Sequence, residues 1–186
     1  PRRSNPDAAR KSAIRRGGQR AGTTRLYSPA GRDVSTTTGR RTAVSQHPDP
    51  QQMIEYMHER AGAFMRILGG HLEAIDQQRG WARLRWHPTE ACCHSGTIVQ
   101  GGFVTSMLDA AMAHAITARI GTGMMAPTLD LNVSFFRVCN PGPHFSEGSV
   151  VHCTRLVAFA EALLTDASGT PIARATATCK VAPLKG

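Results

Sequence analysis

The sequence predicts an α+β fold in which an antiparallel β-sheet wraps around one long central helix. Three features support this fold class. Residues 101–120 form a helical stretch that is apolar nearly all round, as expected of a buried helix. Three blocks rich in strand-forming residues follow, separated by the turn segments CNPGPH and ASGT. A buried helix followed by consecutive strands is typical of an antiparallel sheet packed around that helix.

Two further elements are expected before the central helix. Residues 48–68 carry apolar side chains at helical spacing after the start signals Asp49 and Pro50, so they predict one amphipathic helix that ends at Gly69. Its apolar face consists of Met53, Met57, Phe64 and Leu68.

Residues 71–88 predict a β-hairpin that turns near Arg79-Gly80. Pro88 ends its second strand, and Trp81 and Trp86 are expected in the core of the sheet. Residues 90–100 are expected to form a loop.

The blocks after the helix are expected to form three or four strands in a meander. They cover residues 126–138, 145–166 and 171–182, and the middle block is long enough to bend or to hold two strands.

The positive charge of the chain is confined to its first 47 residues. These contain eleven Lys/Arg and two Asp/Glu (11 − 2 = +9), while residues 48–186 contain eleven of each (11 − 11 = 0). The first segment is rich in Arg, Ser, Thr and Gly and has few large apolar side chains, which predicts a disordered tail. We therefore expect a tail over 1–47 and one globular domain over 48–186. The tail fits a solvated extension best, with a transit peptide or a nucleic-acid-binding arm as alternatives.

Composition disfavours several classes of protein. The sequence has no apolar run long enough to span a membrane and no apolar signal-peptide core. The neutral domain gives nucleic-acid binding no support. Five cysteines without CxxC spacing suit a reducing compartment, so a cytoplasmic location is expected, or a mitochondrial one if the tail is a transit peptide. Cys92-Cys93-His94 lacks a second ligand cluster, so no metal is expected.

Asp109 is the unusual residue of the central helix. A buried carboxylate without a partner costs on the order of several kcal/mol, so the chain needs a reason to keep it. One reading is structural, with a bond to a backbone or hydroxyl group such as that of Thr105, one turn earlier. The other is chemical: Gly101 and Gly102 lack a Cβ where the helix begins, so backbone N–H groups there can approach a ligand oxygen. Such donors are what an oxyanion hole requires, and Asp109 can supply a base or nucleophile.

Three segments carry a resemblance to a known family. GTIVQGGFVTSMLDAAMAHA, PTLDLNVSFFRVCNPG and PIARATATCKV resemble the hotdog-fold acyl-CoA thioesterases of the phenylacetate-degradation type, which are related to the 4-hydroxybenzoyl-CoA thioesterases. The resemblance covers roughly residues 65 to 182. It implies a hotdog fold, a homodimer or homotetramer with active sites at the dimer interface, an acyl-CoA substrate and no separate cofactor.

The resemblance also implies roles for individual residues. The backbone N–H of Gly101 would polarise the thioester carbonyl, and Asp109 of the other subunit would activate water or attack directly. Thr128 would help to position the water. His94 stands where many members have Asn, and Gln100 where they have His or Gln. The substrate-binding residues that it implies are Gly102, Arg137 and Arg155.

Two other functions remain open. His94 lies fifteen residues before Asp109, close to the His-to-acid spacing of the hotdog hydroxyacyl dehydratases, and such a pair moves protons. The second alternative is a non-catalytic module that binds acyl-CoA. His114, on the same helix, is expected to be a bonded core or interface histidine.

Overall fold

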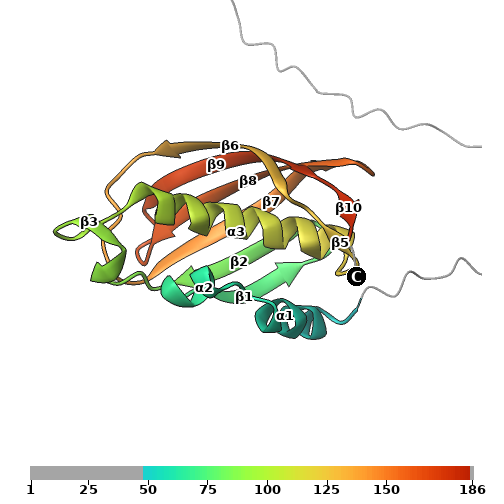
Figure 1. Ribbon diagram of the computed structural model, residues 1–186, viewed down its shortest axis with the longest axis horizontal. Coiled ribbons are helices and arrows are strands. Elements are labelled where there is room, and N and C mark those ends of the chain that lie inside the picture. Colours follow the sequence, from blue (N-terminus) through green and yellow to red (C-terminus); the bar gives the residue numbers. More distant parts are fainter. Residues whose placement is uncertain (1–47, 185–186) are drawn as a thin grey trace, which may run out of the picture. The chain divides into compact units, whose positions relative to one another are not determined.

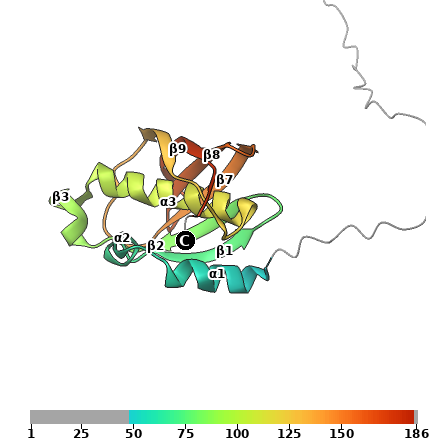
Figure 2. The same ribbon diagram turned by 45° about the vertical axis from the view of Figure 1, so that its right-hand side comes forward.

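A six-stranded antiparallel sheet and one long helix make up most of the domain. The computed structural model describes residues 48–184, so the predicted tail lies outside the described residues. The helix α3 (Gly101–Ile120) lies across one face of the sheet, and the shorter helices α1 (Pro50–Glu59) and α2 (Ala63–Ile67) lie beside β1, as Figures 1 and 2 show. The sheet contains β1 (His71–Asp76), β2 (Trp81–Trp86), β6 (Thr128–Phe135), β7 (His144–Cys153), β8 (Val157–Asp166) and β9 (Pro171–Lys180). The predicted fold class is therefore confirmed.

The strand order is β1-β2-β7-β8-β9-β6. The middle block of the sequence forms two strands, β7 and β8, and β7, β8 and β9 make the expected meander. The expectation was wrong for β6, which pairs with β9 and not with β7. The hairpin strand β2 occupies the free side of β7, so β6 joins the other edge of the meander. One side of β6 is consequently left as a sheet edge.

The central helix has the predicted limits. Gln100 caps its first turn, and Gly121 ends it with a φ of 89°. Its buried side chains include Met107, Leu108 and Met112, which pack with Trp86 and Leu164 of the sheet in one core. Gly148 of β7 allows this close approach, because a Cβ at that position would lie 2.2 Å from the Ala111 carbonyl oxygen.

The amphipathic helix predicted over 48–68 is two helices. α1 ends at Glu59, and Gly62 begins α2 from an extended conformation. The break turns α2 so that Phe64 is 43% exposed, although Met53, Met57 and Leu68 are buried as expected. The periodicity of the apolar residues continued through Gly62, so it did not reveal the break.

The hairpin of β1 and β2 is confirmed, with Gly80 in its turn at a φ of 62°. Trp86 lies in the core, where its indole N–H donates a hydrogen bond to Ser146 Oγ at 2.7 Å. Trp81 does not lie in the core. It is five residues from Trp86 on the same strand, so its side chain points to the opposite face of the sheet, where it is half-buried.

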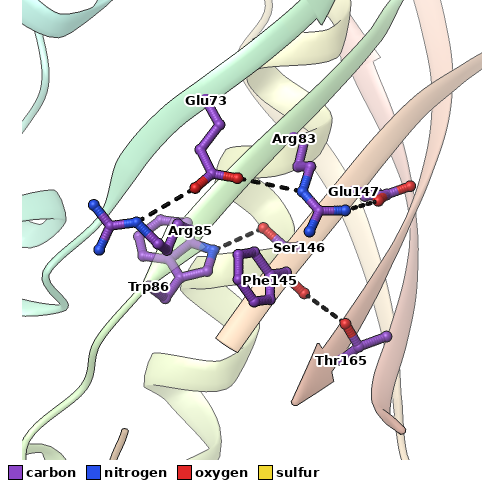
Figure 3. A network of polar contacts seen from close by, with 8 residues as sticks. All are labelled: Glu73, Arg83, Arg85, Trp86, Phe145, Ser146, Glu147 and Thr165. Atoms are coloured by element: carbon purple, nitrogen blue, oxygen red, sulfur yellow. Dashed lines mark hydrogen bonds and ion pairs between the residues drawn. The ribbon is translucent and has the colours of Figure 1, made fainter. Parts of the chain in front are cut away.

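The outer face of the sheet carries paired charges. Arg83 contacts Glu147 at 2.6 Å and Glu73 at 3.3 Å, Arg85 contacts the same Glu73 at 3.3 Å, and the Arg83 guanidinium lies over the Phe145 ring (Figure 3). These side chains bridge β1, β2 and β7. Their charges are mutually satisfied and exposed, so each pair contributes little to stability.

The loop expected over 90–100 contains short regular elements. A 3-10 turn (Glu90–Cys92) leads into a small hairpin of β3 (Cys93–Ser95) and β4 (Ile98–Val99). A second two-stranded pair joins β5 (Met124–Met125) to β10 (Ala182–Pro183). Such two- and three-residue strands are too short to show an alternating pattern in the sequence.

The five cysteines are free thiols. Across residues 48–184, no helix is long and apolar enough to cross a membrane.

Candidate active site

Asp109 lies midway along α3 and is half-buried. Its Oδ1 accepts a hydrogen bond from the Thr128 hydroxyl of β6 at 2.9 Å. Asp109 is therefore bonded to a hydroxyl, as the structural reading expected, but the partner is not Thr105, whose hydroxyl donates to the Gly101 carbonyl at 2.9 Å. Thr128 thus fixes one carboxylate oxygen of Asp109 and leaves the other available.

The thiol of Cys179 contacts the Asp109–Thr128 pair. Cys179 of β9 is buried, and its Sγ lies 3.8 Å from Thr128 Oγ1. Burial raises the pKa of Cys179, so the thiol stays protonated at neutral pH and can donate to the Thr128 oxygen. Thr128 can accept from Cys179 while it donates to Asp109. The sequence did not indicate Cys179, because only the register of β6 and β9 pairs it with Thr128.

The start of α3 offers one free backbone donor. The N–H of Gly102 donates to Gln100 Oε1 at 2.6 Å, so Gln100 acts as a helix cap and this N–H is occupied. Among the described residues, no acceptor forms a hydrogen bond with the Gly101 N–H. The free donor at the positive end of the helix dipole is therefore Gly101 and not Gly102.

Strand β6 lies alongside α3 between these two groups. Its first residue, Thr128, contacts Asp109, and its last, Phe135, lies next to Gly101, where an added Cβ would meet the ring at 3.4 Å. Gly101 and Asp109 are eight residues apart, about 12 Å along the helix axis. Within one chain they are too far apart to act on the same carbonyl group.

A cavity of about 390 Å³ opens beside Asp109, between α3 and the two N-terminal helices. Apolar side chains dominate its wall, and they include Met57, Met65, Ala110, Ala113, Met124 and Leu184. A cavity of this size and character suits a small organic group.

His114 is a second polar group in this cavity. Its Nδ1 lies 2.7 Å from the Ala110 carbonyl oxygen. Burial lowers the pKa of His114, and the nearby His58 lowers it further against the opposing effect of the Ala110 bond. The imidazole is therefore neutral at pH 7. The expectation of a bonded histidine was correct for Nδ1, but the cavity that His114 borders could not be predicted from the sequence.

The remaining predicted residues lie away from Asp109. His94 is exposed on β3, and its Nδ1 contacts Ser95 Oγ at 2.9 Å. Arg137 is exposed, and its guanidinium donates to the Pro171 carbonyl at 2.8 Å. Arg155 is exposed in the turn between β7 and β8, which the Thr154 hydroxyl closes by accepting from the N–H of Val157. Within one chain, the structure brings Thr128 to Asp109 and leaves these groups apart.

Other hollows offer weaker candidates. One of about 350 Å³ on the outer face includes Arg83 and Glu147, whose charges already pair with each other. No group of three His, Cys, Asp or Glu side chains within residues 48–184 is arranged to hold a metal ion. Cys139 lies 3.4 Å from His144 Nε2, and burial raises its pKa to about 11, so it is an inert core thiol.

Comparison with known proteins agrees with the geometry. The model of the acyl-CoA thioesterase C-terminal domain matches residues 25–181. No curated protein gives a significant sequence match. A phenylacetic acid degradation-related protein from Ralstonia eutropha JMP134 has 30% sequence identity and a TM-score of 0.63, over 69% of this chain and 98% of that protein.

Two more distant structures share the fold. The E. coli PaaI protein from the phenylacetic acid degradation operon has 17% identity and a TM-score of 0.62, over 73% of this chain and 94% of that one. A Streptococcus mutans UA159 protein bound to acetyl CoA has 17% identity and a TM-score of 0.55, over 62% and 90% of the two chains.

Proposed function

The chain belongs to the acyl-CoA thioesterase family, and from this premise we propose how its own residues carry out the reaction. The family match confirms the hotdog resemblance and the activity that it implied. The protein hydrolyses acyl-CoA thioesters to a free acid and coenzyme A. The observation that carries our assignment of residues is the Asp109–Thr128 hydrogen bond at the edge of an apolar cavity.

We propose that the working site is formed by two copies of the chain. A two-fold contact between β6 edges is isologous, so the start of one strand lies opposite the end of the other. The start of β6 contacts Asp109 and its end contacts Gly101. The two-fold pairing therefore brings Asp109 of one copy near Gly101 of the second. The exposed apolar side chains Leu129, Phe135 and Phe136 favour burial of this edge.

In the proposed reaction, the thioester carbonyl oxygen accepts a hydrogen bond from the Gly101 N–H. Asp109 takes a proton from a water molecule as the water oxygen attacks the carbonyl carbon. The oxyanion that forms is stabilised by Gly101 and by the positive end of the α3 dipole. When the C–S bond breaks, the coenzyme A sulfur leaves and receives the proton, and the acid is released. The proposed reaction uses no separate cofactor, and coenzyme A enters it as a portion of the substrate.

The other candidate residues surround this reaction. Thr128 holds the Asp109 carboxylate in place, and Gln100 supports the start of α3 by capping Gly102. We place His94 near the thioester, in the position where many relatives have Asn. Arg155 is the better candidate of the two arginines for a coenzyme A phosphate, because Arg137 already donates to Pro171.

The test is coenzyme A release from short, long and aromatic acyl-CoAs by wild type and Asp109→Asn. We expect the substitution to lower kcat by at least about a hundredfold, because it removes the base. Full activity in Asp109→Asn would refute the assigned role. A single turnover in ¹⁸O-labelled water should label the released acid, whereas unlabelled acid would mean that Asp109 attacks the carbonyl directly.

His94→Asn separates the thioesterase from the dehydratase alternative. A thioesterase should keep most of its activity, because Asn occupies this position in many relatives. A dehydratase that relies on a His94–Asp109 pair would lose all of its activity on hydroxyacyl thioesters. Saturable binding of acyl-CoA without turnover would instead favour a non-catalytic module.

A further inference from the structure

We propose that His114 is a specificity-determining residue that selects acyl groups carrying a hydroxyl several carbon atoms away from the thioester carbonyl. The proposal rests on the proposed function, because it takes Asp109 as the point at which the carbonyl binds. The hydroxyl would donate a hydrogen bond to His114 Nε2. The acyl group would lie in the cavity between α3 and the N-terminal helices.

The cavity leads from the reacting position to His114. Asp109 and His114 both contribute to its wall, with Ala110 and Ala113 between them on α3. An acyl chain whose carbonyl lies at Asp109 can therefore extend along α3 over two methyl groups. Met57 and Met65 cover the opposite side. Apolar contact explains how the acyl chain is bound, but it does not by itself favour an acyl chain that carries a hydroxyl.

The hydrogen bond at Nδ1 fixes the tautomer of His114. The carbonyl oxygen of Ala110 can only accept, so Nδ1 must carry the hydrogen over the 2.7 Å contact. In the neutral ring, Nε2 then holds a lone pair and no hydrogen. Since burial keeps the pKa of His114 low, this state persists at neutral pH. Nε2 can therefore accept a hydrogen bond from a donor on a ligand.

Nε2 is not fully buried. No polar group within residues 48–184 forms a hydrogen bond with Nε2. In the same part of the chain, no fully buried side-chain nitrogen or oxygen lacks a partner. Nε2 must therefore be accessible, and the cavity is the open space that His114 borders.

Most of the other polar side chains of the cavity can donate a hydrogen bond themselves. The Tyr56 hydroxyl donates to the Thr122 carbonyl at 3.4 Å, and the Arg60 guanidinium lies 4.1 Å from the centre of the Tyr56 ring. Asp109 serves the reaction. Thr117 and Thr122 carry hydroxyls that can donate as well as accept. Among the described residues that line the cavity, His114 Nε2 is therefore the neutral side-chain group that can only accept, and it favours a hydroxyl donor on the acyl group.

The positions of Asp109 and His114 on the helix set a lower limit on the length of the acyl group. His114 follows Asp109 by five residues, which is about 7.5 Å along the helix axis and about 140° around it, so the two side chains are at least this far apart. An extended six-carbon chain with a terminal hydroxyl spans a distance of this order. The matched probes are therefore 6-hydroxyhexanoyl-CoA and hexanoyl-CoA, which differ only in the proposed donor.

The experiment compares kcat/KM for the two thioesters in wild type, His114→Leu and His114→Gln. His87→Leu is the control, since His87 is exposed and does not border the cavity. We expect wild type and His87→Leu to prefer the hydroxylated thioester by about tenfold. His114→Leu should reverse the preference, because an apolar wall penalises a hydroxyl. His114→Gln, which retains an acceptor, should restore part of it.

A ratio near one in wild type, or the same ratio in wild type and His114→Leu, would overturn the proposal while leaving the thioesterase assignment intact. If wild type hydrolyses neither thioester, the proposed function fails on these substrates, and calorimetric binding of the intact thioesters decides the question. Tighter binding of 6-hydroxyhexanoyl-CoA that is lost in His114→Leu would support recognition by His114. Equal affinities would exclude it.

Discussion

Gly101 illustrates how a single missing side chain serves the proposed chemistry. A Cβ at this position would meet the Phe135 ring at 3.4 Å, which is an ordinary contact, and alanine favours a helix more than glycine does. Gly101→Ala should therefore fold with an unchanged or higher melting temperature. The added methyl group would crowd the oxygen that binds at the Gly101 N–H, so we expect kcat/KM for coenzyme A release to fall by about tenfold or more.

The contrast with Gly148 separates function from packing. A Cβ on Gly148 would lie 2.2 Å from the Ala111 carbonyl oxygen, so Gly148→Ala must displace α3 or β7 and should lower stability. Thermal unfolding of both variants distinguishes the two cases. If Gly101→Ala also unfolded at a much lower temperature, its lost activity would no longer indicate an oxyanion-binding role.

The site was predictable from the sequence only where local pattern sufficed. Asp109 stood out because a charge interrupts an apolar helix, and Gly101 because it begins that helix. Thr128 came from the resemblance, and its contact with Asp109 needs β6 to lie beside α3. Cys179 and the cavity at His114 depend on strand register and helix docking, neither of which the spacing of residues encodes.

At the scale of elements, long periodic segments were predicted well and their interruptions were not. The α3 helix has the predicted ends because Gln100 and Gly121 are local capping residues. The break between α1 and α2 was not predicted, because the apolar residues keep their helical spacing across it. Helix α1 ends at Glu59 and is held to β1 by a hydrogen bond that involves a histidine, so its contribution to stability depends on pH.

His58 anchors α1 to the sheet and makes stability depend on pH. Its Nε2 accepts a hydrogen bond from the Leu72 N–H at 3.2 Å, and its ring lies 4.4 Å from that of His71. Burial and, to a lesser extent, His71 lower the pKa of His58 below 6.5, because both oppose a positive charge. The unfolded chain therefore binds the proton first as the pH falls. The contribution of His58 to stability is present above pH 6.5 and is lost as the pH falls through 6.5 towards the lower pKa of the folded state.

Urea unfolding between pH 8 and pH 5 checks this expectation. The free energy of unfolding should fall below pH 6.5 in wild type, and His58→Gln should reduce that fall, because its amide oxygen can accept from Leu72 without titrating. Part of the fall should remain, since the pKa of His114 is lowered in the same direction. An identical pH dependence in wild type and His58→Gln would show that His58 does not set it.

At the scale of the whole domain, the fold class followed from one apolar helix and the strands after it, but the strand order did not. The position of β6 depends on which edge of the meander the hairpin of β1 and β2 takes, and that choice involves residues far apart in sequence. The result matters for function. A strand that carries Thr128 at one end and Phe135 at the other is left at the edge of the sheet, where a second copy can pair with it.

Leu129→Glu tests whether activity needs that second copy. Leu129 is 63% exposed on β6, so a charge there should leave the folded monomer intact and oppose burial of the edge. We expect light scattering to show a shift from dimer towards monomer, with a parallel loss of coenzyme A release. Activity should also rise again at high protein concentration, because association restores the shared site.

Leu163→Glu is the matched control. Leu163 is 38% exposed on the outward side of β8, in the interior of the sheet order, so a charge there leaves the β6 edge unchanged. This variant should keep the dimer and its activity. A monomeric Leu129→Glu variant with wild-type activity would mean that one chain holds a complete site. Gly101 and Asp109, about 12 Å apart along α3, would then have to act on different parts of the substrate.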